Sequence, residues 1–293
     1  MKAVRTITEL RAQIEELKSS LNKTTVGLVP TMGYLHQGHA SLIRAAKEKS
    51  DIVVVSIFVN PIQFGPGEDF ETYPRDEERD LAAAEGAGAD LVFLPSVDTM
   101  YPKAAKTRIA VSDVTSGLCG ASRPGHFDGV TTVVSKLFHI VQPDYAFFGM
   151  KDAQQVAVIE QMVFDLNFNV EIVPCPIIRE EDGLALSSRN VYLSPEERSQ
   201  ALVLSQSLRK TQEALEKREI RTAGEARDLL VSNIGKSSLA VIDYVEVVAF
   251  PELSLLEDDA GVLENGEPVL MALAVKFGKT RLIDNCLLYP KGE

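Results

Sequence analysis

Residues 26–46, VGLVPTMGYLHQGHASLIRAA, show the architecture of the chain most clearly. The segment begins with the apolar run of residues 26–29, whose length and composition are typical of a strand buried on both faces. Leu42, Ile43 and Ala46 then follow at helical spacing, after a turn that contains glycine. A buried strand that leads into a helix is the beginning of a βαβ unit, so the segment predicts an α/β protein with a parallel sheet.

The same alternation continues beyond this segment. Four further apolar runs have strand length, at residues 52–59, 91–94, 145–148 and 170–173, and helical patterns occur at residues 130–141 and 156–163. Strands that alternate with helices predict right-handed crossovers and an open, Rossmann-like parallel sheet. Ligands bind such sheets at the carboxyl ends of the strands, so we expect a site in the loops after Val29, Val59 and Phe148.

The pattern changes after Pro174-Cys175-Pro176, where a second domain is expected. Ser194 and Pro195 are typical of a helix start, because serine caps the free N–H groups and proline fits the first turn. The elements expected after them are helices at roughly residues 195–216 and 222–235 and strands at residues 241–250, 269–276 and 281–288. We therefore predict two domains, with the parallel sheet in residues 1–176 and a smaller α+β domain in residues 177–293.

Composition and charge limit the classes of partner. The chain of 293 residues has a formal net charge of −12 and a pI of about 4.9, which disfavours binding to nucleic acid or to an anionic membrane surface. It has no apolar leader and no run of about 18 apolar residues, so we expect a cytoplasmic protein without a membrane segment. Cys119, Cys175 and Cys286 form no C-x-x-C pair, which predicts buried free thiols, and we assign no metal ligands.

His36 and His39 form the first candidate site, in the turn between the buried strand and the next helix. A helix N-terminus presents unpaired N–H groups and about half a positive charge, so it attracts phosphate. Two imidazoles three residues apart can face the same side and donate hydrogen bonds to phosphate oxygens. The alternative is a capped turn whose histidines are solvated or paired with the backbone.

Two polar pairs follow other predicted strands. Lys151 can neutralise phosphate charge, and Asp152 beside it can hold a ribose hydroxyl or merely cap the next helix. Asn60 and Gln63 can orient the hydroxyl and carboxylate groups of a small substrate, or they can simply form a turn.

Three other features are less specific. The Ser-Ser-Arg triplet of residues 187–189 offers two hydroxyls and a guanidinium fork to a triphosphate, although such triplets are common in exposed loops. Residues 123–129, RPGHFDG, form either a lid-like loop or an ordinary entry turn before a helix. His139 lies in the apolar run of that helix, and we expect it to be a core residue.

These motifs together resemble a known family. The HQGH turn resembles the HxGH element of the nucleotidylyltransferase and class I aminoacyl-tRNA synthetase superfamily, and LSSR stands where its KMSKS-like element would. The strings PTMGYLHQGH, FVNPIQFG, RPGHFDGV, FFGMKDAQQ and ALSSRN resemble the pantothenate synthetase family, in that family's order and across nearly the whole chain. The resemblance implies a homodimeric ligase that joins pantoate to β-alanine through an acyl-adenylate, with ATP and Mg²⁺.

The resemblance also implies roles for individual residues. His39 is the family's assigned proton donor, and His36 would bind the phosphates beside it. Lys151 would stabilise the pentacoordinate α-phosphate, and Arg189 would clamp the terminal phosphates. The implied ATP site comprises Met32, Gly33, Tyr34, Leu35, His36, Gln37, Gly38, His39, Gly149, Met150, Lys151, Asp152, Ile178, Leu186, Ser187, Ser188 and Arg189. The implied pantoate site comprises Gln63 and Gln155, with Asn60 and Tyr73 shaping the same pocket.

Two other functions are compatible with the first motif. A nucleotidylyltransferase would use the same turn but leave AMP on its product, a small phosphorylated acceptor. A nucleotide-binding sensor domain would bind ATP without releasing pyrophosphate. The second is disfavoured because charged and polar candidates stand on several separate loops.

Overall fold

The computed structural model describes residues 1–21, 24–264 and 266–290, which form two compact units. The first unit comprises Met1–Val111, Arg123–Met150 and Val158–Ile178, and the second comprises Ser112–Ser122, Lys151–Ala157 and Arg179–Glu293. The chain therefore passes between the units several times before the second unit is complete. The division into a domain of residues 1–176 and a domain of residues 177–293 stays a prediction.

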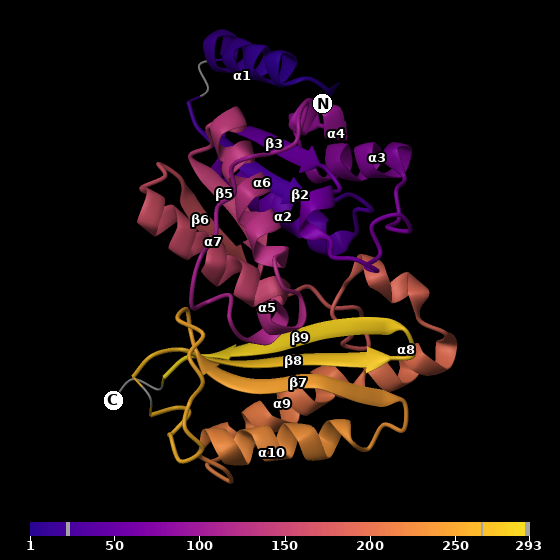
Figure 1. Cartoon of the computed structure of the whole chain (residues 1–293), viewed down its shortest axis with the longest axis vertical. Helices are drawn as coiled ribbons and strands as arrows, with labels where there is room; N and C mark the ends of the chain where they lie inside the picture. Colours follow the sequence, from indigo (N-terminus) through magenta and orange to yellow (C-terminus); the bar gives the residue numbers. More distant parts are fainter. Residues whose placement is uncertain (22–23, 265, 291–293) are drawn as a thin grey trace. The chain divides into compact units, whose positions relative to one another are not determined.

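Six parallel strands form the sheet of the first unit, in the order β1-β4-β3-β2-β5-β6 (Figure 1). Their bounds are Lys2–Val4 for β1, Val26–Thr31 for β2, Ile52–Ile57 for β3, Leu91–Phe93 for β4, Tyr145–Gly149 for β5 and Glu171–Cys175 for β6. The predicted Rossmann-like parallel sheet is thereby confirmed. Strand β1 was not predicted, because only Val4 of its three residues is buried and the segment has no apolar run.

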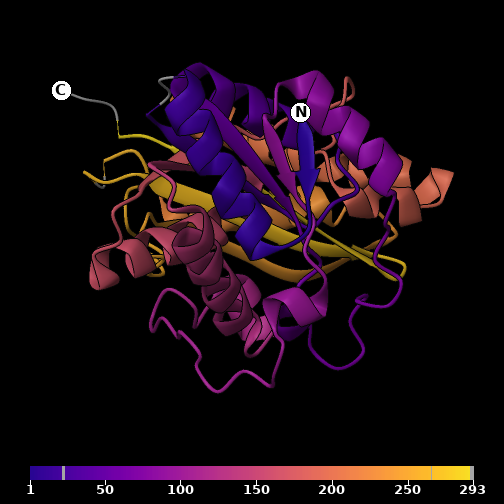
Figure 2. The same ribbon diagram turned by 90° about the horizontal axis from the view of Figure 1, so that it is seen from above.

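Helices cover both faces of this sheet. Helix α2 (Gln37–Lys49) contacts β2, β3 and β5 and also packs against α3 (Glu77–Ala87). Helices α1 (Ile7–Leu21) and α6 (His126–Val141) contact each other, and α6 packs against β2. In Figure 2, α1 is drawn in indigo and lies in front of the strands. Short helices before α7 (Ala153–Leu166) are η1 (Pro61–Gln63), α4 (Val97–Met100), α5 (Leu118–Ser122) and η2 (Met150–Asp152).

His139 is exposed, so the prediction that it belongs to the core was wrong. Helix α6 buries twelve of its sixteen residues, but Lys136 and His139 lie three positions apart on its remaining face. The apolar run hid this narrow polar stripe. The imidazole instead packs beside the ring of Phe168, with 5.3 Å between ring centroids.

A three-stranded antiparallel sheet, in the order β7-β8-β9, forms the centre of the second unit. Strands β7 (Ala240–Ala249), β8 (Val269–Phe277) and β9 (Thr280–Leu288) have the predicted positions, and Figure 1 shows α9 and α10 along one face. Buried apolar side chains from both layers, including Leu204, Leu230 and Leu273, form one core. Each such side chain contributes roughly 1.5–3 kcal/mol through removal from water. The smaller α+β architecture is confirmed.

The helix predicted at residues 195–216 is divided in two at Leu202. Helix α8 spans Pro195–Ala201 with Ser194 as its N-cap, and α9 spans Val203–Glu216. Leu202 keeps helical dihedral angles, but its N–H is directed to the carbonyl of Gln200, so the regular ladder of hydrogen bonds is interrupted there. Helix α10 (Ala223–Ile234) then follows.

The three cysteines are free thiols. Cys175 is buried, whereas Cys119 and Cys286 are only half-buried, so the expected burial holds fully for one of the three. Among the residues that the structure describes, no helix is both long and apolar enough to cross a membrane.

Candidate active site

The chain leaves the neighbouring strands β2 and β5 toward opposite edges of the parallel sheet. The chain runs from β2 to β3 on one side of β2, whereas it runs from β5 to β6 on the other side. Connections that leave neighbouring strands in opposite directions open a crevice at their carboxyl ends, where ligands bind. Residues 32–39 follow β2 directly, and β5 ends at Gly149, followed by Met150.

His36 and His39 cap the helix that starts in this turn. His36 is the N-cap of α2, and its Nδ1 accepts a hydrogen bond from the Gly38 N–H at 3.1 Å. The Nδ1 atom of His39 accepts from the His36 N–H at 3.3 Å, and the two ring centroids are 4.1 Å apart. A neutral imidazole that accepts at Nδ1 carries its proton on Nε2. The capping alternative therefore describes the turn correctly, and a neutral ring at either position has its proton on Nε2.

Asp80 of α3 fixes the backbone of this turn, and sequence reasoning did not find it. Its carboxylate accepts hydrogen bonds from the N–H groups of Tyr34 and Leu35, at 2.7 and 2.6 Å. Gly33 has φ +88°, and a Cβ there would lie 2.9 Å from the Asp80 Oδ2. Burial raises the pKa of Asp80, although the two N–H bonds oppose this shift. A signal exists in the sequence: Asp80 shares its helix face with the buried residues Ala84 and Ala87.

Asn60 and Gln63 lie in the loop after β3 and are nearly inaccessible to solvent. The Asn60 Nδ2 donates to the Gln63 Oε1 at 3.0 Å and to the Gly129 carbonyl at 3.1 Å. The Tyr101 hydroxyl donates to the Asn60 Oδ1 at 2.9 Å. Asn60 thus holds the Gln63 amide in place, while the Gln63 Nε2 lies 3.1 Å from the Met32 sulfur. The structure therefore brings a predicted pantoate residue into contact with a predicted ATP residue.

The loop of residues 123–129 supports Gln63 from the other side. Arg123 forms a bidentate ion pair with Glu68, at 2.6 and 2.7 Å, and also contacts the His126 Nε2 at 2.9 Å. The His126 Nδ1 lies 2.8 Å from the Gln63 carbonyl oxygen. At Gly129 a Cβ would come within 2.5 Å of the Gln63 Cα, so only glycine allows this approach. The loop is an entry turn to α6 that holds the Gln63 backbone.

The remaining candidates of the first unit are Tyr73 and Ile178. Tyr73 is buried and packs edge-on against Phe64, with 6.1 Å between ring centroids. Ile178 is half-buried at the end of the last segment of this unit.

The other candidates belong to the second unit. The Lys151 Nζ pairs with Asp152 at 3.1 Å, and the lysine side chain keeps 21% of its surface exposed. Ser187 caps the short helix η3 (Ser188–Tyr192), because its hydroxyl accepts from the Arg189 N–H at 3.3 Å. Leu186, Ser187 and Arg189 are half-buried and Ser188 is buried.

Gln155 is half-buried, whereas its neighbour Gln154 is buried and points elsewhere. The Gln154 Nε2 donates to the carbonyls of Val114 and Gly117, at 3.0 and 2.9 Å. Of the two adjacent glutamines, Gln154 therefore fixes the segment of residues 114–117, and Gln155 is the one with a partly accessible side chain.

Comparison with known proteins identifies the family. The sequence profile of pantoate–β-alanine ligase matches residues 2–287 of this chain. The chain belongs to the pantoate–β-alanine ligase family. The resemblance drawn from the motifs is confirmed, and the family is one of enzymes that ligate an acid to an amino acid. The protein is therefore a ligase, and the alternative of a sensor domain without enzymatic activity is excluded.

Individual relatives agree over their whole length. The pantothenate synthetase of Acetivibrio thermocellus is 56% identical over 288 residues, which cover 98% of this chain and 99% of that protein. The crystal structure of pantothenate synthetase from Thermus thermophilus matches with a TM-score of 0.89 at 46% identity, covering 99% of this chain and all of the other. A Francisella tularensis pantoate–β-alanine ligase, solved with β-γ ATP and β-alanine, matches with a TM-score of 0.76 at 35% identity, covering 98% of this chain and 97% of the other.

Proposed function

We propose that the protein joins pantoate to β-alanine in two steps with ATP as the second substrate. In the first step a pantoate carboxylate oxygen attacks the α-phosphorus, the bond from this phosphorus to the bridging oxygen breaks, and pyrophosphate leaves. In the second step the neutral amine of β-alanine attacks the acyl carbon, the bond to the AMP oxygen breaks, and AMP leaves. The amine loses a proton to complete the amide.

The observation that carries this proposal is the paired histidine cap on α2. Both imidazoles accept backbone N–H groups at Nδ1, so the proton of each neutral ring is on Nε2 and the ring orientation is preset. Donors that are already oriented stabilise charge as it develops on the phosphate oxygens, without reorganisation during the reaction. Deletion of one such donor typically costs about 3–4 kcal/mol of transition-state stabilisation.

We assign the binding roles as the family resemblance implies. In the first unit, residues 32–39 with Gly149, Met150 and Ile178 would bind ATP, and Gln63, Asn60 and Tyr73 would bind pantoate. These assignments are supported by the contact of Met32 with Gln63 and by the hydrogen bond from Asn60 that holds the Gln63 side chain. The second-unit residues to which we assign roles are Lys151 at the α-phosphate, Asp152 at the ribose, Gln155 at pantoate, Leu186 at the adenine, and Ser187, Ser188 and Arg189 at the terminal phosphates.

We further propose that Mg²⁺ enters with the nucleotide, that the protein is a homodimer and that it acts in the cytoplasm. Mg²⁺ is typically bound through substrate phosphates with few protein ligands, which agrees with treating it as part of the substrate. Equilibrium sedimentation with purified protein would test the homodimer, and a monomer at micromolar concentration would contradict it.

Pyrophosphate exchange tests the two-step reaction directly. With ATP and Mg²⁺, labelled pyrophosphate should enter ATP only when pantoate is present, and addition of β-alanine should release AMP. Absence of pantoate-dependent exchange would rule out the adenylate. A stable adenylylated product that β-alanine does not consume would instead indicate nucleotidyl transfer.

A further inference from the structure

Two adjacent residues of β9, Asp284 and Asn285, point to opposite faces of their sheet. Side chains alternate between the two faces along a strand. Leu282 and Leu288 lie an even number of positions from Asp284, so the three side chains are on the same face, which is the one that packs in the core under α9 and α10. Both polar residues are nevertheless almost completely buried, with 3% and 4% of their surfaces exposed. A buried polar group in the middle of a strand destabilises the fold unless it is hydrogen-bonded, so the partners of these two residues show what the pair holds in place.

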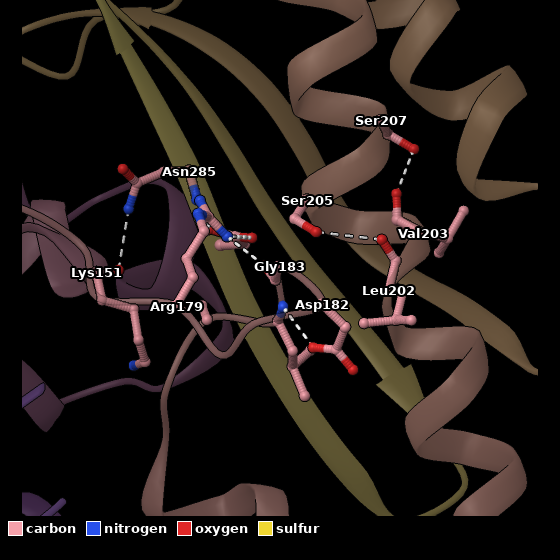
Figure 3. Close-up of polar contacts among 12 residues, drawn as sticks. Lys151, Arg179, Asp182, Gly183, Leu202, Val203, Ser205, Ser207 and Asn285 are labelled. Carbon is pink, nitrogen blue, oxygen red and sulfur yellow. Dashed lines mark hydrogen bonds and ion pairs between the residues drawn. The ribbon is translucent and has the colours of Figure 1, made fainter. Parts of the chain in front are cut away.

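Asn285 holds the loop that carries Lys151. Its Nδ2 donates to the main-chain carbonyl of Lys151 at 3.0 Å, and Figure 3 shows the amide pointing toward this loop. The bond joins residues 134 positions apart in sequence. It leaves the Lys151 ammonium group uninvolved, so it fixes the backbone from which the charged side chain extends.

Asp284 holds a second segment through Arg179. The guanidinium donates to both carboxylate oxygens of Asp284, at 2.7 and 2.9 Å, and its Nη1 also donates to the Gly183 carbonyl at 3.2 Å. Burial works to lower the pKa of Arg179, but the hydrogen bond and charge of Asp284 outweigh it, and the net pKa is raised. Figure 3 shows Arg179 reaching across the turn toward Gly183.

This turn leads directly into the serine pair. Arg179 and Ala185 form an antiparallel bridge, and the Glu180 N–H donates to the Leu184 carbonyl at 2.8 Å, so residues 179–185 form a small hairpin. The Asn190 Nδ2 donates to the Ala185 carbonyl at 3.0 Å and thereby ties the middle of η3 to the hairpin. Ser187 and Arg189 stand between these two fixed points.

We propose that Asp284 and Asn285 are a positioning pair that sets Lys151 and the segment of residues 187–189 in register with each other. The inference rests on the roles proposed above for Lys151 and for this segment. A single rigid strand holds both through adjacent residues, so the phosphate-binding groups of the second unit cannot shift independently. Neither residue touches substrate in this scheme; each acts through the backbone that it anchors.

Asn285→Ala is the decisive variant. Loss of the bond to the Lys151 carbonyl should lower kcat for pantothenate formation by about 10- to 100-fold, because displacements near 1 Å can cost 100-fold. The KM for ATP should change by less than about threefold, because Lys151 acts mainly in the transition state. Asn233→Ala is the matched control: Asn233 is equally buried, at 5% exposure, but lies on α10 and its side chain bonds Lys236. This control should lose stability in urea yet keep the wild-type kcat.

A double-mutant cycle separates the inference from the proposed function. Lys151→Ala should lose at least as much kcat as Asn285→Ala, and adding Asn285→Ala to it should cause little further loss, because one residue acts through the other. Losses that multiply would overturn the inference while leaving the role of Lys151 intact, as would an unchanged kcat in Asn285→Ala. An unchanged kcat in Lys151→Ala would overturn both.

The partner residue gives an opposite kinetic signature. Asp284→Asn should raise the KM for ATP by about 5- to 10-fold with a smaller effect on kcat, because residues 187–189 would bind phosphates in the ground state as well. Equal effects of the two variants on both parameters would show a general structural role and would contradict the positioning pair.

Discussion

The histidine turn and the Ser187–Arg189 segment are two phosphate-binding candidates built in different ways. Residues 36–39 are held by hydrogen bonds to main-chain N–H groups. His36 and His39 cap the helix to which they belong, and Asp80, a residue of the neighbouring helix, accepts from Tyr34 and Leu35 just before it. The segment of residues 187–189 follows a hairpin that is held instead by ion pairs, Arg179 with Asp284 and Arg198 with Glu180 and Asp182.

The difference concerns which perturbations each region tolerates. A turn made by a strand end and a helix cap keeps its shape as long as the sheet and most of its hydrogen bonds remain, so we expect the loss of His39 alone to affect the reaction more than the fold. A segment held by charges in partly exposed positions responds to the loss of single anchors, to pH and to salt. Four changes, ordered by expected effect, test this contrast.

His39→Ala should slow pantoate-dependent pyrophosphate exchange by about 100-fold or more, because it removes an oriented donor. The midpoint of thermal unfolding should stay close to that of the wild type, since the His36 cap remains. His139→Ala, at the exposed histidine of α6, is the control and should leave exchange unchanged. A large fall in stability with exchange per folded molecule preserved would show that His39 serves the fold alone.

Asp284→Asn should lower the free energy of unfolding in urea by about 2 kcal/mol. Breaking a buried pair typically costs about 3–5 kcal/mol, but the Arg179 side chain is 30% exposed and water compensates part of the loss. Asp258→Asn is the matched control, because Asp258 pairs with Arg227 while 79% exposed, and its effect should be below about 0.5 kcal/mol. Equal losses in the two variants would remove the distinction between buried anchor and surface pair.

Asp80→Asn should lower the free energy of unfolding by about 1–2 kcal/mol, because an amide has one acceptor for two buried N–H groups. The exchange rate should fall about 10-fold through displacement of the turn. Urea unfolding and the exchange assay on the same preparation would measure both. Full activity in a destabilised Asp80→Asn protein would show that the turn keeps its shape without this carboxylate.

Arg198→Ala should have the smallest effect, below about 1 kcal/mol at pH 7. The hydrogen bond from Arg198 lowers the pKa of Asp182 from its ordinary 3.8. A depressed carboxyl pKa stabilises the folded state above the ordinary value, and the contribution disappears as pH falls through the folded value. Urea unfolding of wild type and Arg198→Ala should therefore differ at pH 7 and converge as the pH falls below the lowered pKa of Asp182. A difference that persists there would assign the effect to packing of the arginine stem.

Regular elements and the histidine turn could be predicted because their signals are local. Apolar runs marked five of the six parallel strands and all three antiparallel ones, and the residues after β2 carry a helix start in their own sequence. Strand β1 failed because three residues at a sheet edge have no pattern of their own. The break at Leu202 failed because a change in hydrogen-bond register leaves the apolar periodicity intact.

The supporting residues could not be predicted, for a different reason. Tyr101, Arg179 and Asp284 are single polar residues whose partners are distant in sequence, so spacing carries no trace of them. For Asp80 the helical spacing with Ala84 and Ala87 indicates a buried position, but nothing in the sequence indicates its partners, Tyr34 and Leu35. The candidates named from motifs could be predicted because their residue types and spacing indicate a chemical role. Those that hold them in place became visible only when the strands and helices were assembled.

The bond from Asn285 to Lys151 also constrains when the protein can become active during its synthesis. Ribosomes add about 5–20 residues per second, so residue 285, which is 134 positions further along, emerges roughly 7–27 s after Lys151. A growing chain that has already folded its parallel sheet around the histidine turn would still lack the anchor of Lys151, and with the role proposed for Asn285 it would reach full activity only after β9 has joined β8.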